Sequence, residues 1–217
     1  MSTTKRGLFI TFEGGDGSGK STQMRRLAAR LRADGQTVLE TVEPGGTAIG
    51  MQIRRVLLDS KNHELRPTTE LLLMFAARAQ NVDELILPAL SRGEVVLCDR
   101  FTDSSLVYQG AARGLGAEVV YEVDRIACRG LVPDLTIVVD IETELGLERA
   151  RGRNQKAQDV ETRIDEQAIG FHRKVREAYL QLAAEEPNRV KLVDGAGSEE
   201  EVEKDVWDAV FAFLKRP

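Results

Sequence analysis

The sequence predicts an α/β protein in which a five-stranded parallel sheet lies between two layers of helices. Five short strand-like segments alternate with helical patterns along the 217 residues, as expected when parallel strands are joined through helices. Two of these segments, 95–98 and 135–139, are unbroken apolar runs, which is typical of strands buried on both faces. At 42% hydrophobic residues, the chain is large enough to form one domain with a full core, so we expect 1–217 to be a single domain.

The predicted elements follow in a regular order. In the first helix, Met24, Leu27, Ala28 and Leu31 share one face, and the last helix repeats the pattern with valines three to four residues apart. Residues 152–161 are polar and charged, which predicts a mobile loop between two helices. The predicted strands are 8–13, 37–43, 95–99, 135–140 and 189–193, and the predicted helices are 19–34, 47–58, 68–90, 117–129, 143–152, 162–186 and 198–214.

The overall charge and the few cysteines exclude several classes of protein. A net charge of −5 argues against a protein that coats nucleic acid. The chain has no run of about 18 apolar residues and no signal-peptide pattern at its start, so we expect a cytoplasmic protein without a membrane span. Cys98 and Cys128, with His63 and His172, show no zinc-ligand spacing, and we expect two reduced, buried thiols.

Residues 14–21, Gly-Gly-Asp-Gly-Ser-Gly-Lys-Ser, fit the G-x-x-x-x-G-K-[ST] pattern of a P-loop. The pattern stands between an apolar strand and a helix, which is the setting that a P-loop requires and a chance glycine-rich turn lacks. Its backbone N–H groups cradle phosphates, Lys20 adds a positive charge, and Ser21 offers a hydroxyl to Mg²⁺. We therefore expect Mg²⁺ and a nucleoside triphosphate here, bound by Gly14, Gly15, Asp16, Gly17, Ser18, Gly19, Lys20, Ser21 and Thr22.

Polar residues follow the other predicted strands, where ligands bind in open parallel sheets. Asp99 ends an apolar strand, so it is placed either as a second Mg²⁺ ligand or as an ordinary carboxylate that caps a loop. Arg100 follows, and its guanidinium can grip a phosphate or form a surface ion pair. The turn at Pro44 precedes the helix that carries Arg54, and together these residues can shape a substrate pocket.

Two further groups of residues have both a functional and a structural interpretation. Phe75 and Arg78 share a helix face, so they can stack on a base and bond its edge, although core packing is the commoner fate of such a phenylalanine. Arg149, Arg151 and Arg153 precede the polar loop and cannot all share one face. They are either a solvated charge run or mobile arginines that close over a transferring phosphoryl group.

Blocks along nearly the whole chain resemble the bacterial thymidylate kinases (dTMP kinases) of the P-loop nucleoside monophosphate kinase group. The P-loop is common to many families, whereas the combination of the remaining blocks is specific. The blocks are Phe-Glu-Gly at 12–14, Glu-Pro-Gly-Gly-Thr at 43–47, Leu-Met-Phe-Ala-Ala-Arg at 73–78, Asp-Arg-Phe at 99–101, Tyr-Gln-Gly at 108–110, Pro-Asp-Leu-Thr at 133–136 and the arginine-bearing stretch 146–151.

The resemblance implies a P-loop NTPase fold and phosphoryl transfer from ATP·Mg²⁺ to dTMP, giving ADP and dTDP for dTTP synthesis. It implies that Asp16 contacts the sugar of dTMP or positions phosphates, that Phe75 stacks on thymine and that Arg78 bonds the carbonyl edge of the base. Tyr108 would exclude a 2′-hydroxyl, and Arg54 and Arg100 would hold the 5′-phosphate. The implied dTMP-binding set is Asp16, Pro44, Arg54, Phe75, Arg78, Arg100, Ser104, Ser105, Tyr108 and Gln109.

The resemblance also bears on the source of catalytic positive charge. Some members carry an arginine in the P-loop, and others carry it in a lid; Gly17 and the lid arginines place this chain in the second type. With a lid at about 149–163, Arg153 is the candidate for the γ-phosphate and Arg149 for the adenine side. The implied catalytic set is Lys20, Asp16, Arg153 and Arg100, with Ser21 and Asp99 as the metal ligands.

Other functions remain open at this point. Another P-loop small-molecule kinase would share the phosphate loop but act on a different nucleotide or nucleoside. A nucleotide-switch module would need an ordered switch and a partner surface, but no aromatic–arginine pocket. The resemblance further implies a homodimer, formed through apolar helix faces such as 68–90, with no nucleic-acid partner.

Overall fold

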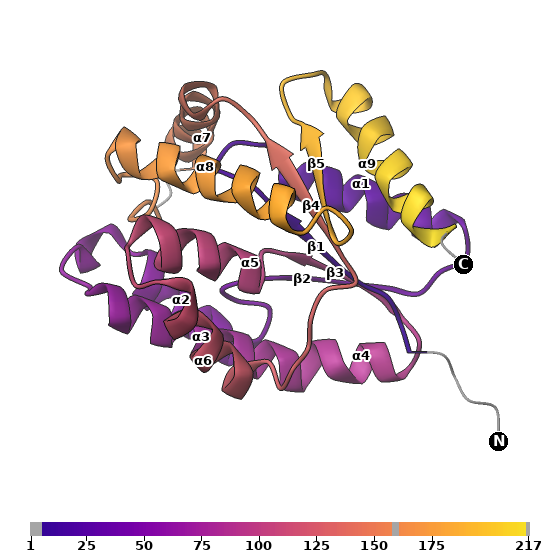
Figure 1. Ribbon diagram of the computed structural model, residues 1–217, viewed down its shortest axis with the longest axis horizontal. Coiled ribbons are helices and arrows are strands. Elements are labelled where there is room, and N and C mark those ends of the chain that lie inside the picture. The colour runs from indigo at the N-terminus through magenta and orange to yellow at the C-terminus, as the bar shows by residue number, and fades with distance from the viewer. Residues whose placement is uncertain (1–5, 158–160, 216–217) are drawn as a thin grey trace.

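The computed structural model describes residues 6–157 and 161–215, with the side chains of 153–157 left out. Its centre is a five-stranded parallel sheet in the order β2-β3-β1-β4-β5 (Figure 1), as the sequence predicts. The strands are β1 (Phe9–Glu13), β2 (Val38–Val42), β3 (Val95–Asp99), β4 (Leu135–Asp140) and β5 (Val190–Asp194).

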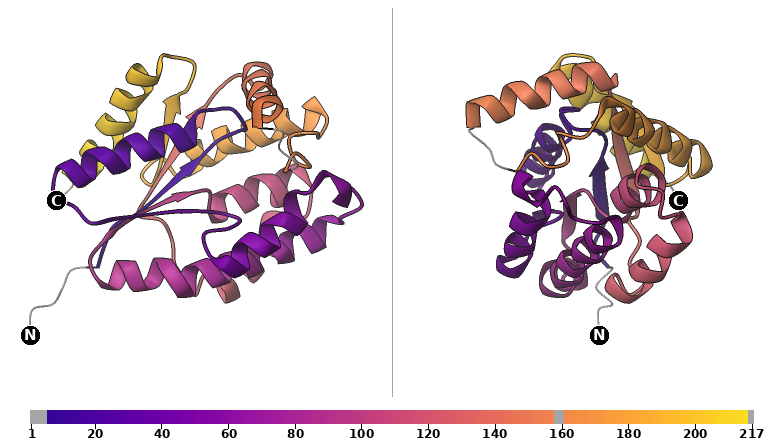
Figure 2. Two further views of the ribbon diagram at one scale, coloured as in Figure 1. Left: turned by 180° about the vertical axis from the view of Figure 1, so that it is seen from behind. Right: turned by 90° about the vertical axis from the view of Figure 1, so that its left-hand side faces the viewer.

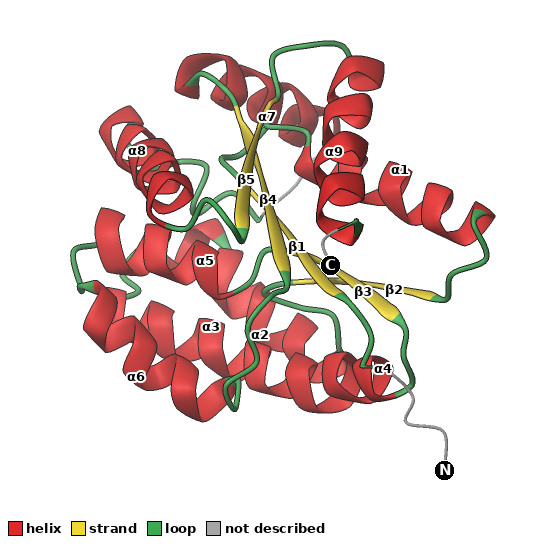
Figure 3. Ribbon diagram, turned by 45° about the vertical axis from the view of Figure 1, so that its right-hand side comes forward, coloured by secondary structure: helices red, strands yellow, loops and turns green. Residues whose placement is uncertain are grey.

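Helices cover both faces of the sheet (Figure 3). One face packs against α1 (Lys20–Ala33) and α9 (Glu199–Leu214), which lie side by side (Figure 2). The other face packs against α3 (Pro67–Asn81), α4 (Leu87–Ser91), α6 (Ala117–Ala127) and α8 (Ile169–Glu185). The three-layer α/β/α prediction is therefore confirmed.

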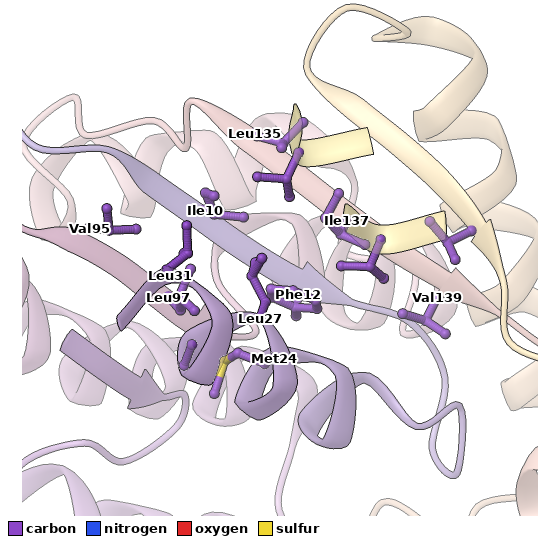
Figure 4. Packing of buried hydrophobic residues seen from close by; sticks show 14 of the residues in the cluster. Ile10, Phe12, Met24, Leu27, Leu31, Val95, Leu97, Leu135, Ile137 and Val139 are labelled. Atoms are coloured by element: carbon purple, nitrogen blue, oxygen red, sulfur yellow. The ribbon is translucent and has the colours of Figure 1, made fainter. Parts of the chain in front are cut away.

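The largest part of the core lies between the sheet and α1 (Figure 4). Alternate residues of β1 point to opposite faces, so Ile10 and Phe12 meet the buried face of α1 while Phe9 joins the cluster beneath α3 and α6. The α1 face predicted from the sequence, Met24, Leu27, Ala28 and Leu31, is buried in this core. The core thus fixes the strand ends and the loop between β1 and α1.

The predicted helix 68–90 forms with an irregular middle. After α3, residues Val82–Ile86 adopt a π-helical turn, and α4 follows directly as the last part of the helix. Pro88 lacks the N–H that an α-helical bond to its preceding turn would use, which accounts for the change of pitch just before it. The helix begins at Pro67, one residue earlier than predicted.

Two predicted boundaries were wrong and one helical segment was missed. The helix α7 (Thr143–Ala157) extends through 152–157, where a loop was expected, because residue types such as the arginine at 151 and the glutamine at 155 have a high helix propensity. Residues 158–160 of that predicted loop lie outside the described residues. The helix α8 begins at Ile169, whereas 162 was expected.

The missed segment comprises α5 (Thr102–Ser105) and the π-helical turn η3 (Leu106–Ala112). The remaining helical pieces are α2 (Ala48–Leu58) and the short 3-10 turn η1 (Ser60–Asn62). Among the described residues, no helix is both long and apolar enough to cross a membrane. Both cysteines are buried free thiols, as expected.

Candidate active site

A cavity of about 420 Å³ opens at the carboxyl ends of β1, β2 and β3. It contains the P-loop on one side and side chains from α2, α3, α5 and η3 on the other. Fifteen of the predicted site residues line it, although they come from six separate stretches of the sequence: Asp16, Gly17, Gly19, Lys20, Ser21, Thr22, Pro44, Arg54, Arg78, Asp99, Arg100, Ser104, Ser105, Tyr108 and Gln109.

The P-loop passes from β1 into α1, which begins at Lys20. The N-terminus of α1 faces the cavity, so its unpaired N–H groups add to the positive potential there. The Lys20 side chain is only 9% exposed. Burial lowers its pKa, and the nearby Arg100 lowers it further, while Asp99 and Asp16 oppose that shift. The lysine is therefore held in the P-loop between another cation, Arg100, and the carboxylates of Asp99 and Asp16.

Gly17 occupies a position that tolerates no side chain. Its backbone has a φ of 73°, and a Cβ built there would lie 2.0 Å from the carbonyl oxygen of Gly146 in α7. On the other side of this contact, a Cβ on Gly146 would lie 2.6 Å from the carbonyl oxygen of Asp16. The P-loop and α7 therefore touch through backbone atoms, which explains sterically why no arginine stands at position 17.

The two predicted metal ligands are in direct contact, because the Ser21 hydroxyl donates a hydrogen bond to the Asp99 carboxylate. Asp99 is buried at the end of β3, and both residues line the cavity beside Lys20. Among the described residues, no three His, Cys, Asp or Glu side chains could hold a metal on their own. The pair instead fits Mg²⁺, which takes one or two protein oxygens and completes its shell with phosphate and water.

Arg100 contacts both the P-loop and Tyr108. Its Nη2 donates to Asp16 Oδ1 at 2.9 Å, and its guanidinium lies 4.9 Å from the ring centre of Tyr108. The backbone of Arg100 has a φ of 74°, which directs the side chain from the end of β3 back toward the P-loop. Three predicted residues, Asp16, Arg100 and Tyr108, are thus brought together at the cavity.

Arg78 is held in a buried network. Its Nε donates to the carboxylate of Glu43, its Nη1 donates to Ser105 Oγ at 3.1 Å, and its Nη2 donates to the carbonyl oxygen of Phe101 at 3.0 Å. Glu43 also accepts from Asn81 Nδ2 at 3.1 Å. Glu43 was part of the sequence block 43–47 but was not predicted as a site residue; in the structure it holds the Arg78 guanidinium in place.

Phe75 does not reach the cavity, so the prediction that it stacks on thymine finds no support in this geometry. Its ring is 2% exposed, belongs to the core cluster under α3, and lies 4.4 Å from the guanidinium carbon of Arg78. Met74, four residues before Arg78, lines the cavity instead. Both positions share a face with Arg78 on a helix, and sequence spacing does not distinguish the side that faces the core from the side that faces the cavity.

Arg54 forms an ion pair with a residue that the sequence did not single out. Its Nε donates to Glu161 Oε2 at 2.7 Å, and its Nη1 donates to the Pro44 carbonyl oxygen at 2.9 Å. Both ionic side chains are about a quarter exposed, at 24% and 23%, and both residues line the cavity. The arginine predicted to hold the 5′-phosphate therefore already contacts an acidic group.

Gln109 lines the cavity, but its amide also braces the surrounding helices. Gln109 Nε2 donates to Glu70 at 2.9 Å, and Glu70 forms ion pairs with Arg163 at 2.7 Å and with Arg113 at 3.2 Å. Arg163 is almost completely buried. Its position in this network makes it an anchor for the segment that precedes α8.

The remaining predicted ATP-binding residues lie in α7 and the P-loop. Arg149 Nη1 donates to the carbonyl oxygen of Gly195 at 3.1 Å, in the loop between β5 and α9. The backbone of α7 passes through Arg153, but its side chain lies outside the described residues. Gly14 and Gly15 line a small pocket of about 20 Å³ behind the P-loop, and Ser18 is buried.

His172 and Tyr179, both on α8, complete the surroundings of the P-loop, and neither was predicted as a site residue. His172 Nδ1 lies 4.0 Å from Asp16 Oδ2, and burial lowers the pKa of this imidazole. The Tyr179 hydroxyl forms hydrogen bonds with Arg100 and Ser104. Their spacing within α8 resembles that of ordinary core residues, and only the packing of α8 against the P-loop brings them to the site.

A P-loop, an adjoining serine–aspartate pair and an arginine-rich wall across one cavity define a P-loop phosphotransferase of the kinase class. Comparisons with known proteins give the particular family. The family described as "Thymidylate kinase" matches residues 12–206, so the chain belongs to the thymidylate kinase family. The resemblance inferred from the sequence blocks is confirmed.

Individual relatives agree with this family. The chain is 52% identical to a thymidylate kinase of Pelobacter propionicus over 90% of each protein. It is 47% identical to a thymidylate kinase of Deinococcus radiodurans over 94% of this chain and 97% of the relative. The solved structure of thymidylate kinase from Ehrlichia chaffeensis is similar with a TM-score of 0.75 and 28% identity, covering 95% of this chain and 99% of that one.

Proposed function

We propose that this chain transfers the γ-phosphoryl group of ATP to dTMP, giving ADP and dTDP for dTTP synthesis. The observation that carries the proposal is that one cavity joins the P-loop to an acceptor wall built from Arg54, Arg78 and Arg100. The family membership supports the choice of dTMP as acceptor. Catalysis then consists of positioning two charged substrates and stabilising the charge that shifts between them.

On the donor side, the P-loop N–H groups and Lys20 bind the β- and γ-phosphates. Ser21 and Asp99 would hold Mg²⁺, which neutralises phosphate charge when bound. Arg149 stands beside the Gly195 loop and serves the adenine end of ATP. The lid at about 149–163 contributes Arg153, which we propose as the cation for the transferring group.

On the acceptor side, Arg100 and Arg54 bind the 5′-phosphate, and Asp16 contacts the sugar or the phosphates. Arg78 and Ser105 present donors to the base edge, so a base with a different edge would leave these buried groups unpaired. We propose that Met74 supplies the thymine contact that Phe75 was expected to make, because a thioether packs well against an aromatic ring. Tyr108 closes the space near the sugar where a ribonucleotide carries its 2′-hydroxyl.

We extend the proposal to a homodimer that acts in the cytoplasm. Exposed apolar side chains on α2 and α3 support self-association: Ile49, Val56 and Leu72 are 49%, 46% and 54% exposed. Light scattering of the purified chain would test the assembly. A mass corresponding to a single chain across the working concentration range would remove the dimer from the proposal.

A coupled ADP-release assay tests the substrate. With ATP and Mg²⁺ present, the acceptors dTMP, dUMP, dCMP, dGMP, UMP and thymidine are compared under one set of conditions. We expect the highest kcat/KM for dTMP. A preference for another acceptor would point to a different small-molecule kinase, and slow ATP hydrolysis without any acceptor dependence would favour a nucleotide-switch module.

A further inference from the structure

A buried cluster of three polar side chains lies directly beneath Arg100. Glu13 ends β1, Ser104 belongs to α5 and Tyr179 belongs to α8; their exposed fractions are 0%, 7% and 2%. Ser104 Oγ and Tyr179 OH donate to Glu13 Oε2 at 2.5 and 2.7 Å. The backbone N–H of Phe101 donates to Glu13 Oε1 at 2.7 Å. The carboxylate therefore gathers donors from two regions far apart in the sequence, 101–104 and α8.

Arg100 meets the same two hydroxyl groups from the opposite side. Its Nη1 donates to Ser104 Oγ at 3.1 Å and lies 3.4 Å from Tyr179 OH. Each hydroxyl has one proton, and an ionised carboxylate can only accept hydrogen bonds. When both hydroxyl protons point to Glu13, the oxygen lone pairs face the guanidinium. Glu13 thus determines whether the hydroxyls present acceptors or donors to Arg100.

We propose that Glu13 and Tyr179 are positioning residues that fix the Arg100 guanidinium for the 5′-phosphate of the acceptor, Glu13 through the hydroxyls of Ser104 and Tyr179, and Tyr179 through its own hydroxyl. The inference rests on the proposed role of Arg100 in binding dTMP. Tyr179 comes from the helix that follows the lid, so α8 takes part in setting the geometry of the acceptor side. Neither residue lines the 420 Å³ cavity.

A purely structural role for Glu13 explains the cluster less well. Burying a carboxylate is costly, and apolar residues of similar volume usually stabilise a core at least as well. The hydrogen bonds that link Arg100 to Glu13 run through the two hydroxyls. Here the buried carboxylate orients two hydroxyls that contact a cavity arginine. Such an arrangement is typical of a functional site rather than of a hydrophobic core.

The charges around Glu13 make its ionisation sensitive to pH. Burial raises its pKa to about 7, the nearby Asp103 contributes in the same direction, and Arg100 and the hydrogen bonds from Ser104 and Tyr179 oppose the shift. Lys20 also interacts with this carboxylate. Below about pH 7 the carboxyl becomes protonated and can itself donate, so a hydroxyl is free to turn its proton toward Arg100. Acceptor binding should then weaken as the pH falls.

The variants Tyr179→Phe and Glu13→Gln test the proposal through steady-state kinetics with dTMP and ATP varied separately. Each should raise KM for dTMP about tenfold, roughly the effect of one hydrogen bond to a charged group, while KM for ATP stays within about twofold. In wild type, kcat/KM for dTMP should fall as the pH drops below about 7, because Glu13 becomes protonated. In Glu13→Gln this fall should be smaller, because the side chain at position 13 no longer titrates.

Thr11→Val is the matched control. Thr11 lies two residues before Glu13 in β1, and its buried hydroxyl contacts Thr136 Oγ1 at 2.8 Å without touching Arg100. It should lower the melting temperature without a selective change in KM for dTMP. Circular dichroism shows whether each variant folds, and Tyr179→Phe keeps the packed ring if Glu13→Gln does not fold.

Two results would overturn the inference while the wild type still phosphorylates dTMP. One is an unchanged KM for dTMP in both variants; the other is an equal rise of KM for ATP and dTMP, as expected from general loosening. A wild-type enzyme without dTMP-dependent ADP release would instead contradict the proposed function, so the two failures are distinguishable.

Discussion

Replacing Gly17 with alanine should destabilise the protein strongly, although the change adds a single methyl group. The methyl would lie 2.0 Å from the carbonyl oxygen of Gly146 and 3.1 Å from the backbone nitrogen of Ala150. These are backbone atoms of α7, so no side chain can rotate away to make room. Either the P-loop or the whole start of α7 must move.

The magnitude follows from two separate costs. A non-glycine residue held at a φ of 73° loses about 1 kcal/mol, and forcing an extra carbon into a packed contact costs about 2 kcal/mol. Together they remove about 3 kcal/mol of unfolding free energy. For a chain of this length, each kcal/mol corresponds to about 2–4 °C, so the melting temperature should fall by about 6–12 °C.

Differential scanning calorimetry without nucleotide measures this effect apart from phosphate binding. Gly15→Ala is the matched control in the same loop, because its added methyl has no described atom within 4 Å and the φ of Gly15 lies outside the left-handed range. The control should melt within about 2 °C of wild type, as expected of a substitution without clash or backbone strain. Equal melting temperatures for Gly17→Ala and wild type would refute the steric account of the missing P-loop arginine.

Three further changes test the assigned roles. Glu161→Gln should lower KM for dTMP about fivefold, because the acceptor phosphate must otherwise break the partly buried Arg54–Glu161 pair at 2.7 Å, which contributes about 1 kcal/mol. A double-mutant cycle with Arg54→Lys measures the coupling between the two residues, and additive effects would contradict it. Arg153→Ala should reduce kcat by about 10³-fold while the dTMP dissociation constant measured by calorimetry stays nearly constant, and wild-type turnover would remove this assignment. Tyr108→Ala should narrow the kcat/KM ratio of dUMP over UMP by roughly tenfold, about the effect of one well-placed contact, whereas an unchanged ratio would count against Tyr108 as the sugar gate.

The fold was predictable because its central strands are buried on both faces. The sequences of β3 and β4 are therefore apolar runs of strand length, and the P-loop fixes the position of the first strand and helix. The helical segment 102–112 was missed for the opposite reason. Its buried residues include Asp103, Ser104 and Gln109, so its polarity pattern is that of an exposed loop.

Within the site, sequence blocks located residues but not the directions of their side chains. Arg78 and Arg100 line the cavity, whereas Phe75 is buried in the core and its neighbour Met74 lines the cavity, because adjacent positions on α3 face different sides. Tyr179 reaches Glu13 only because the fold packs α8 against the end of β1. A pattern in a single sequence carries no signal for such a distant contact.

The central claim is most directly tested by following the γ-phosphoryl group itself. Wild-type protein is incubated with γ-labelled ATP, Mg²⁺ and dTMP, and the labelled products are separated. The account predicts that the label moves into dTDP in an amount equal to the ADP formed. Label found only in inorganic phosphate, or label that remains in ATP when dTMP is added, would contradict it.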